Sequence, residues 1–382
     1  MEKNARMNIL IINGTRSHVV KTAALLRYNT ELKHVYAGTD DGIERLCAEL
    51  EIAKPLSLVH IDQTQPDNAF PETLKVCEEV IQKIQPDMVC VMGESLTTYA
   101  ASIAAHIIKK PLIKLSAGNR YHKSWIREEA YAILSDHMAS VLCADDEYAM
   151  DNLEKESIDP KKCYLTGGLH IDSLLRYEKI APHSKILKKI DLPSRGYALL
   201  SFHRPANTLH FKKAQELFGA ACEIHDILPV VSALHPHTQN ISKAFDLKWK
   251  SKYAPQALKR IPYIDHLHLL QNASVVLTDS SSVQDEASAL GVPCLTLADE
   301  TNRMQSIHEG TNVCVGTFRE DIVQQTRKAL RGNWKRRSIN LPLHDGLSAQ
   351  RTLRAIKLEE GVPKSRIDIF VPEMRNHMKG EV

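Results

Sequence analysis

The chain has few aromatic side chains and almost no net charge. Aromatic residues make up 5% of the 382 positions, and 49 lysines and arginines face 46 aspartates and glutamates, for a net charge of +3. With few aromatic residues the chain has little surface on which single-stranded nucleic acids could stack. With almost no net charge it lacks the basic surface that duplexes require. We therefore expect no nucleic-acid partner, and we expect any anionic ligand to be small.

Long apolar runs and paired cysteines are missing as well. The apolar run at residues 9–12 is too short for a signal peptide or a membrane-spanning helix, so we expect a cytoplasmic protein with no membrane partner. The cysteines form no Cys-x-x-Cys pair, which predicts buried free thiols in a reducing compartment rather than a zinc site or a disulfide framework. There are eight, at positions 47, 77, 90, 143, 163, 222, 294 and 314.

Several motifs of nucleotide-dependent and hydrolytic enzymes are absent. No Gly-x-Gly-x-x-Gly follows the first apolar run, and the chain has no P-loop, no Gly-x-Ser-x-Gly and no His-Glu-x-x-His. The dinucleotide, kinase and serine-hydrolase interpretations are therefore excluded. We expect no cofactor and no metal, because arginine, histidine and helix termini can balance phosphate charge and no acidic pair suggests a ligand geometry.

What the chain does contain is a repeated pattern of buried strand, polar turn and helix. The first copy joins the apolar run 7–12, the turn 13–17 and an amphipathic helix at 19–26. Further strand-like runs lie at 88–92, 112–115, 140–144, 197–201, 230–234, 275–277 and 294–297. This alternation predicts an α/β fold with parallel sheets.

The length of the chain suits two domains. We place the first at residues 1–178 and the second at 196–357, with a lysine- and proline-containing linker at 179–195. The remaining residues, 358–382, form a tail that either packs back on the first domain or is mobile.

The polar turns of both domains are expected to border one cleft, because ligands bind at the carboxyl ends of strands in such sheets. Arginine, histidine and hydroxyl groups at successive strand ends indicate a shared anion. The contributing groups are Thr15 and Arg16, Gly93 and Glu94, Ser116 to Arg120, His203 and Arg204, His235 and His237, and Ser280 to Ser282 with Glu286.

The most informative of these turns follows the strand at 275–277. Three consecutive serines, Ser280, Ser281 and Ser282, stand where a helix would begin, so free N–H groups and the positive end of the helix dipole would face an anion such as a diphosphate. An ordinary serine-capped helix is the plain alternative. Glu286, further along the helix, is placed either to accept from ribose hydroxyls or to face solvent.

Three carboxylates of the first domain are candidates for acid and base chemistry at a sugar ring. Glu94 follows a strand, whereas Glu128 and Glu129 lie early in a helix at 127–137, where acidic residues also occur for dipole reasons alone. His203 and His235 could share this work near neutral pH.

An ordered set of motifs resembles the UDP-N-acetylglucosamine 2-epimerase family from about Met7 to Leu358. Residues 117–120 are similar to the branch of the family that acts on deoxy N-acetylhexosamine nucleotides. The motifs are Gly14-Thr15-Arg16, Arg127-Glu128-Glu129-Ala130, His203-Arg204, His235-Pro236 and Asp279-Ser280 with Gln284-Asp285-Glu286-Ala287 and Leu290-Gly291.

The resemblance implies a GT-B fold, with two Rossmann-like domains whose parallel sheets face a central cleft, UDP held by the second and the sugar facing the first. It also implies a homodimer and epimerisation at carbon 2 of a UDP-N-acetylhexosamine, through elimination of UDP and a glycal intermediate. Arg16, His203, Ser280, Ser281 and Ser282 would hold the diphosphate and Glu286 the ribose. Arg120, Arg204, His235 and Arg303 complete the substrate-binding set, and Glu94, Glu128, Glu129 and His203 form the catalytic set.

The chain departs from the family pattern at several of these positions. Glu94 stands in place of an aspartate, and Ser116 in place of a glutamate. Ser281 and Ser282 replace glycines of the phosphate turn, and Arg303 has lost both flanking acids of a Glu-Arg-Pro-Glu motif. Two alternatives therefore stay open: a hydrolysing epimerase or GT-B glycosyltransferase that uses a UDP-sugar, and a non-catalytic UDP-sugar-binding protein or inactive subunit.

Overall fold

The computed structural model describes residues 7–61, 66–232, 238, 256–258, 261–332, 334 and 341–359. Its first domain contains a parallel sheet with strand order β3-β2-β1-β4-β5-β6-β7. The strands are β1 (Ile9–Asn13), β2 (Lys33–Gly38), β3 (Leu58–His60), β4 (Met88–Met92), β5 (Leu112–Ala117), β6 (Val141–Ala144) and β7 (Cys163–Leu165). The helices are α1 (Arg16–Tyr28), α2 (Ile43–Glu49), α3 (Pro66–Ile84), α4 (Leu96–Ile107), α5 (Arg127–Met138) and α6 (Glu147–Lys155).

The second domain repeats this architecture with strand order β10-β9-β8-β11-β12-β13, again parallel. Its strands are β8 (Ala198–Ser201), β9 (Val230–Ser232), β10 (Gln256–Ala257), β11 (Val275–Thr278), β12 (Cys294–Thr296) and β13 (Asn312–Cys314). Its helices are α9 (Pro205–Thr208), α10 (Phe211–His225), α12 (Tyr263–Gln271), α13 (Ser281–Ala289), α14 (Met304–His308) and α15 (Arg319–Leu330). The predicted pair of parallel α/β sheets is confirmed.

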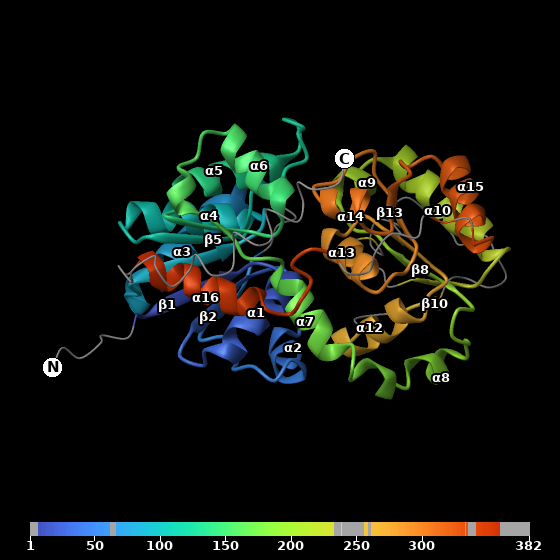
Figure 1. Cartoon of the computed structure of the whole chain (residues 1–382), viewed down its shortest axis with the longest axis horizontal. Coiled ribbons are helices and arrows are strands. Elements are labelled where there is room, and N and C mark those ends of the chain that lie inside the picture. The colour runs from blue at the N-terminus through green and yellow to red at the C-terminus, as the bar shows by residue number, and fades with distance from the viewer. Residues whose placement is uncertain are drawn as a thin grey trace, which may run out of the picture.

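The strand order fixes where a ligand can bind. In the first sheet β1 lies between β2 and β4, and in the second β8 lies between β9 and β11, so the direction of winding reverses beside each of these strands. The helices that follow neighbouring strands then leave on opposite faces and open a crevice at the carboxyl ends. In Figure 1 the two domains stand side by side, with α1 and α13 between the two sheets.

Three helices connect the domains. The chain leaves the first domain through α7 (Leu169–Tyr177) and α8 (Ile186–Ile190), and α16 (Ser348–Glu359) returns to it, lying beside α1 in Figure 1. Asp172 of α7 accepts from the backbone N–H groups of Ser348 at 3.1 Å and Ala349 at 2.8 Å, which fixes the start of α16. The segment that packs back on the first domain therefore begins at α16, before residue 358. Residues 360–382 of the expected tail lie outside the described residues.

The core of each sheet is apolar, and one of its clusters crosses between the domains. Tyr177 of α7 packs edge-on against Tyr263 of α12, with ring centroids 5.9 Å apart.

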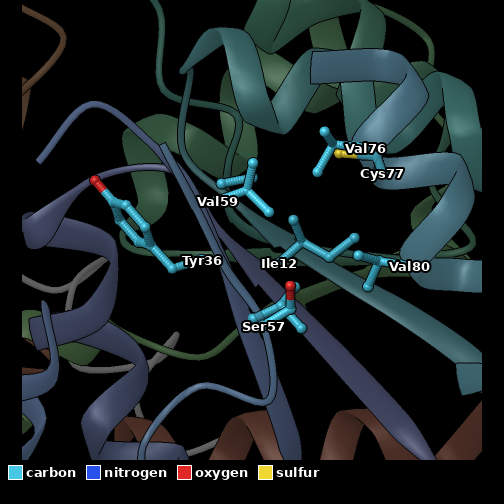
Figure 2. A pocket seen from close by; sticks show the side chains of 9 residues that line it. Ile12, Tyr36, Ser57, Val59, Val76, Cys77 and Val80 are labelled. Atoms are coloured by element: carbon cyan, nitrogen blue, oxygen red, sulfur yellow. The ribbon is translucent and has the colours of Figure 1, made fainter. Parts of the chain in front are cut away.

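A cavity of about 10 Å³ lies between α3 and the first three strands (Figure 2), too small and apolar for a nucleotide. It is lined by Ile12, Val35, Tyr36, Ala37, Ser57, Val59, Val76, Cys77 and Val80.

All eight cysteines are free thiols, five of them buried. Over the described ranges, none of the helices combines the length and the apolar character needed to cross a bilayer.

Candidate active site between the domains

Side chains from the strand ends of both domains meet where the two domains face each other. Ser17 at the start of α1 and Ser282 at the start of α13 have hydroxyl oxygens 2.7 Å apart. Glu94, which follows β4, accepts at Oε1 from Nδ2 of Asn302 in the second domain at 3.0 Å. Three of the predicted polar turns, at 13–17, 93–94 and 280–282, are therefore brought to the boundary between the domains.

Asp279 organises the anion-binding turns of the second domain. Its buried carboxylate accepts from the backbone N–H groups of His203 and Arg204, both at 3.0 Å, and from Nδ2 of Asn207 at 2.9 Å. These bonds hold the turn after β8 against the end of β11. The Arg204 side chain then reaches Ser281, to whose hydroxyl Nη2 donates at 2.6 Å.

The serine turn presents the amino end of α13 to the crevice. Ser280 occupies the N-cap position, but its side chain makes no capping bond, and its own N–H donates to Oγ1 of Thr278 at 3.0 Å. The first-turn N–H groups of α13 therefore lack a side-chain cap, and the helix dipole adds positive potential. This arrangement suits a phosphate group.

Glu286 lies inside the protein, which excludes the solvent-facing alternative. Only 3% of the residue is exposed. Oε1 accepts from the hydroxyl of Tyr263 at 2.9 Å, and Oε2 lies 3.7 Å from Nε2 of His266.

Glu94 is surrounded by cations. Burial acts to raise the pKa of its carboxyl, but four positive side chains outweigh burial and lower the pKa to about 2. The carboxylate is therefore charged at neutral pH. The four cations, in order of effect, are Arg303, Lys21, Arg204 and Lys114.

Lys21 is a site residue that the sequence reasoning missed. It lies on α1 and is 4% exposed. Burial and the neighbouring Arg303 lower the pKa of its ammonium group, while Asp145 and Glu94 oppose that change. The available signal was a lysine inside the apolar run of residues 19–26, because an amphipathic helix normally keeps lysine on its exposed face.

Arg303 pairs with one carboxylate from each domain. Its Nη1 pairs with Oδ2 of Asp145 at 2.9 Å, and its Nε lies 3.4 Å from Oδ2 of Asp285. Asp285 also lies 3.0 Å from Nε2 of His170 and accepts from the Ser306 hydroxyl at 2.6 Å. Although burial acts to raise the pKa of Asp285, Arg303 and His170 hold it well below its usual range.

The two neighbouring glutamates of α5 differ in their surroundings. Glu129 is buried and accepts from the backbone N–H groups of Tyr121 at 2.7 Å and His122 at 2.9 Å, so both of its oxygens fix the turn after β5. Glu128 is partly buried. Arg16, at the start of α1, is also partly buried, and its backbone N–H donates to Asp40 at 3.1 Å.

Arg120 is placed among protein carboxylates rather than beside the serine turn. It is 1% exposed, and its guanidinium pairs with Glu156 at 2.7 Å and Asp136 at 2.8 Å and donates to the backbone oxygen of Asn119 at 2.9 Å. These bonds occupy most of its donors, so the geometry gives it a structural role. His235 and His237 lie outside the described residues.

Ser116, the next-to-last residue of β5, has an unusual backbone conformation. Its φ of 52° lies in the left-handed region, and the register between β5 and β6 shifts between Leu115 and Ala117. The residue is 5% exposed. The position where the family resemblance places a glutamate is therefore a buried bulge beside the site.

The sequence model of the UDP-N-acetylglucosamine 2-epimerase family matches residues 10–357. The chain belongs to this family. The resemblance stated from its motifs and the GT-B fold are thereby confirmed. Among the parts of the chain that the structure describes, no group of three or more histidine, cysteine, aspartate or glutamate side chains is placed to hold a metal ion.

Individual relatives of the family agree over most of the chain. The UDP-N-acetylglucosamine 2-epimerase of Methanocaldococcus jannaschii is 28% identical, over 92% of this chain and 99% of the relative. The UDP-2,3-diacetamido-2,3-dideoxy-D-glucuronate 2-epimerase of Pseudomonas aeruginosa is 30% identical, over 85% of this chain and 92% of the relative. A crystal structure of the M. jannaschii epimerase with UDP-GlcNAc and UDP superimposes with a TM-score of 0.84 at 29% identity, covering 92% of this chain and all of the other.

Proposed function

We propose that the protein is a nucleotide-sugar 2-epimerase that inverts carbon 2 of a UDP-N-acetylhexosamine. The observation that carries the proposal is the placement of Glu94. It is a charged carboxylate of the first domain, and it is held by Asn302 of the second domain next to the anion-binding turns. Chemistry at a sugar that is attached to a diphosphate requires this neighbourhood of carboxylate and cations.

The second domain supplies most of the nucleotide site. Arg204, the serine turn and the amino end of α13 would hold the diphosphate, together with the side chain of His203, whose Nδ1 lies 3.5 Å from Asp279. Glu286 would accept from the ribose hydroxyls. Arg16 would reach the diphosphate from the first domain, since it stands at the start of α1 next to Ser17.

The family resemblance implies the course of the reaction, and the charges at this site suit it. The hydrogen on carbon 2 is not acidic enough for simple deprotonation, so UDP leaves first or together with the proton, and a glycal forms. Cationic groups stabilise the departing diphosphate. Since Arg204 would then be shared with the diphosphate, the pKa of Glu94 would rise toward the range of a useful base. Glu128 would be the second carboxylate at the sugar, while Glu129 fixes the turn.

Hydrolysis of the UDP-sugar is the second candidate function. Ser116 favours it, because a serine at the usual position of a glutamate removes one acid or base from the return step. UDP would then leave without re-adding to the glycal, and water would take its place.

Proton NMR of the protein with UDP-N-acetylglucosamine in deuterated water tests these functions. Epimerisation predicts deuterium at carbon 2 and a new manno-configured nucleotide sugar. Free sugar and UDP would instead establish hydrolysis. If neither UDP-N-acetylglucosamine nor UDP-2,3-diacetamido-2,3-dideoxy-D-glucuronate is converted while UDP binds, the epimerase proposal is wrong and a UDP-sugar-binding protein takes its place.

We also propose that the protein is a homodimer in the cytoplasm. The dimer rests on the family resemblance, and the compartment rests on the eight free thiols. Light scattering coupled to size-exclusion chromatography would show a mass of about twice 42.9 kDa for the dimer.

A further inference from the structure

Tyr121 occupies the centre of the interdomain site, although neither the sequence motifs nor the proposed reaction uses it. It belongs to the turn between β5 and α5 and is 4% exposed. Its backbone N–H donates to Oε2 of Glu129 at 2.7 Å, and the N–H of the next residue donates to Oε1 at 2.9 Å. The position of the tyrosine is therefore fixed from the first domain.

The side chain of Tyr121 meets the anion-binding groups of the second domain. The guanidinium carbon of Arg204 lies 4.8 Å from the centre of its ring, within the range of a cation–π contact. Its hydroxyl donates to Oε1 of Glu94 over 3.4 Å, which is long for a bond between two oxygens. The phenol thus stands between the groups proposed to hold the diphosphate and the carboxylate proposed to face the sugar, which is where the bond between sugar and diphosphate must lie.

The neighbouring hydroxyl of Ser281 is already committed to protein partners. It donates to Oδ1 of Asn302 at 3.0 Å and accepts from Nη2 of Arg204 at 2.6 Å. A hydroxyl has one proton to donate, so Ser281 cannot donate to a ligand without losing its bond to Asn302. Tyr121 would give up only its long 3.4 Å bond to Glu94 in order to donate to a ligand, so it is the better placed donor.

The phenol keeps its proton at neutral pH. Burial raises the pKa of Tyr121 to about 12, although Arg204 acts to lower it and Glu94 acts to raise it further. A group in this state donates a hydrogen bond rather than removing a proton from carbon 2.

We propose that the Tyr121 hydroxyl is a catalytic hydrogen-bond donor to the diphosphate oxygen bonded to carbon 1 of the sugar. The inference rests on the proposed epimerase function. As the bond between carbon 1 and this oxygen breaks, its electron pair stays on the diphosphate, the proton of carbon 2 passes to a carboxylate, and a double bond forms between carbons 1 and 2. Tyr121 retains its proton throughout and stabilises the growing negative charge.

The variant Tyr121→Phe tests this role because it keeps the ring and its contact with Arg204. We expect kcat to fall about 100-fold while KM changes little, as for the loss of one oxyanion donor. The leaving oxygen becomes a terminal β-phosphate oxygen of UDP, so UDP affinity should fall about tenfold and UMP affinity should not change. Tyr99→Phe, within the stack of Phe70, Tyr99 and Tyr131, is the matched control and should behave as wild type.

The two readouts separate this inference from the proposed function. Equal weakening of UDP and UMP, or a wild-type kcat in Tyr121→Phe, would show that the hydroxyl does not donate to the leaving oxygen. A wild-type protein that binds UDP but converts no UDP-sugar would refute the epimerase. In that case the comparison of UDP with UMP in Tyr121→Phe would still show whether the hydroxyl contacts the β-phosphate. A wild-type protein that binds neither nucleotide would refute both proposals.

Discussion

The charge on Glu94 matters more to the proposed chemistry than its size. Glu94→Gln keeps the acceptor for Asn302 but removes the negative charge among the cations. We expect the epimerisation rate to fall by about 10²- to 10⁴-fold, and UDP to bind at least as tightly, because the carboxylate no longer competes with phosphate for the cations. Turnover by NMR and UDP affinity by calorimetry check both parts. Glu154→Gln, at an exposed position of α6, is the control.

A retained rate in Glu94→Gln would remove Glu94 from the catalytic set.

His18 lies on α1 and near Glu94, and we expect it to make the free energy of unfolding depend on pH. Burial, with help from Lys21 and Lys114, lowers its pKa to about 3, although Glu94 and Asp40 act to raise it. The unfolded chain takes up this proton near pH 6.5 and the folded protein does not, so stability is lost as pH falls from about 6.5 toward 3. His18→Asn should flatten the loss by up to about 1.4 kcal/mol per pH unit.

Urea unfolding between pH 7 and 4 measures this slope, with His106→Asn at an exposed position as the control. The asparagine can keep the bond that Nδ1 accepts from the Gly14 N–H at 3.3 Å. An unchanged slope in His18→Asn would show that the buried histidine does not cause the pH dependence.

Sequence reasoning at the residue scale found turns better than it found roles. Arg204 and Glu94 are predictable because each follows a strand, and Glu286 because it lies on the helix after the serine turn. The fold brings Arg204 and Glu94 to the start of that same helix. Arg120 also follows a strand, but its pairing with Asp136 and Glu156 depends on residues 16 and 36 positions away, which spacing does not reveal. The apolar neighbours of Lys21 indicate that it is buried, but a helix pattern does not show which residues of the other domain it faces.

At the scale of elements, strands with a distinct apolar run are predictable from the sequence, and strands without one are not. The runs at 88–92 and 112–115 correspond to β4 and β5. By contrast β7 has only three residues, and β2 contains lysine, histidine and tyrosine, so neither stands out by composition. Their strand conformation comes from pairing with neighbouring strands.

The start of α5 and the turn before it form one element-scale unit. Glu129→Gln replaces one acceptor oxygen by an amide that faces a backbone N–H, so the turn loses one of its two bonds. We expect a loss of about 1–3 kcal/mol in the free energy of unfolding, together with a lower turnover rate as Tyr121 shifts. Glu128→Gln should change the stability much less. If the two variants unfold alike, Glu129 does not hold the turn.

At the scale of the whole molecule, a buried ionic network holds the domains together. Asp285 faces Arg303 of its own domain and His170 of α7, and Arg303 reaches Asp145 of the first domain. Asp285→Ala leaves the buried Arg303 guanidinium without this carboxylate, which costs roughly 3 kcal/mol and favours a more open arrangement. Small-angle X-ray scattering should show a larger radius of gyration, and Asp226→Ala, at an exposed position, should not.

An unchanged radius for Asp285→Ala, with stability also unchanged, would show that apolar packing alone holds the domains closed.

The return of α16 to the first domain also bears on how the protein is made. The Asp172 carboxylate can accept both backbone hydrogen bonds only after Ser348, 176 residues later in the chain, has been synthesised. A ribosome adds about 5–20 residues per second, so roughly 10–35 s pass between the synthesis of α7 and that of the helix that covers it. The domain that is synthesised first is therefore completed last, and the surface under α16 stays open to chaperones, or to aggregation, until the second domain has been made.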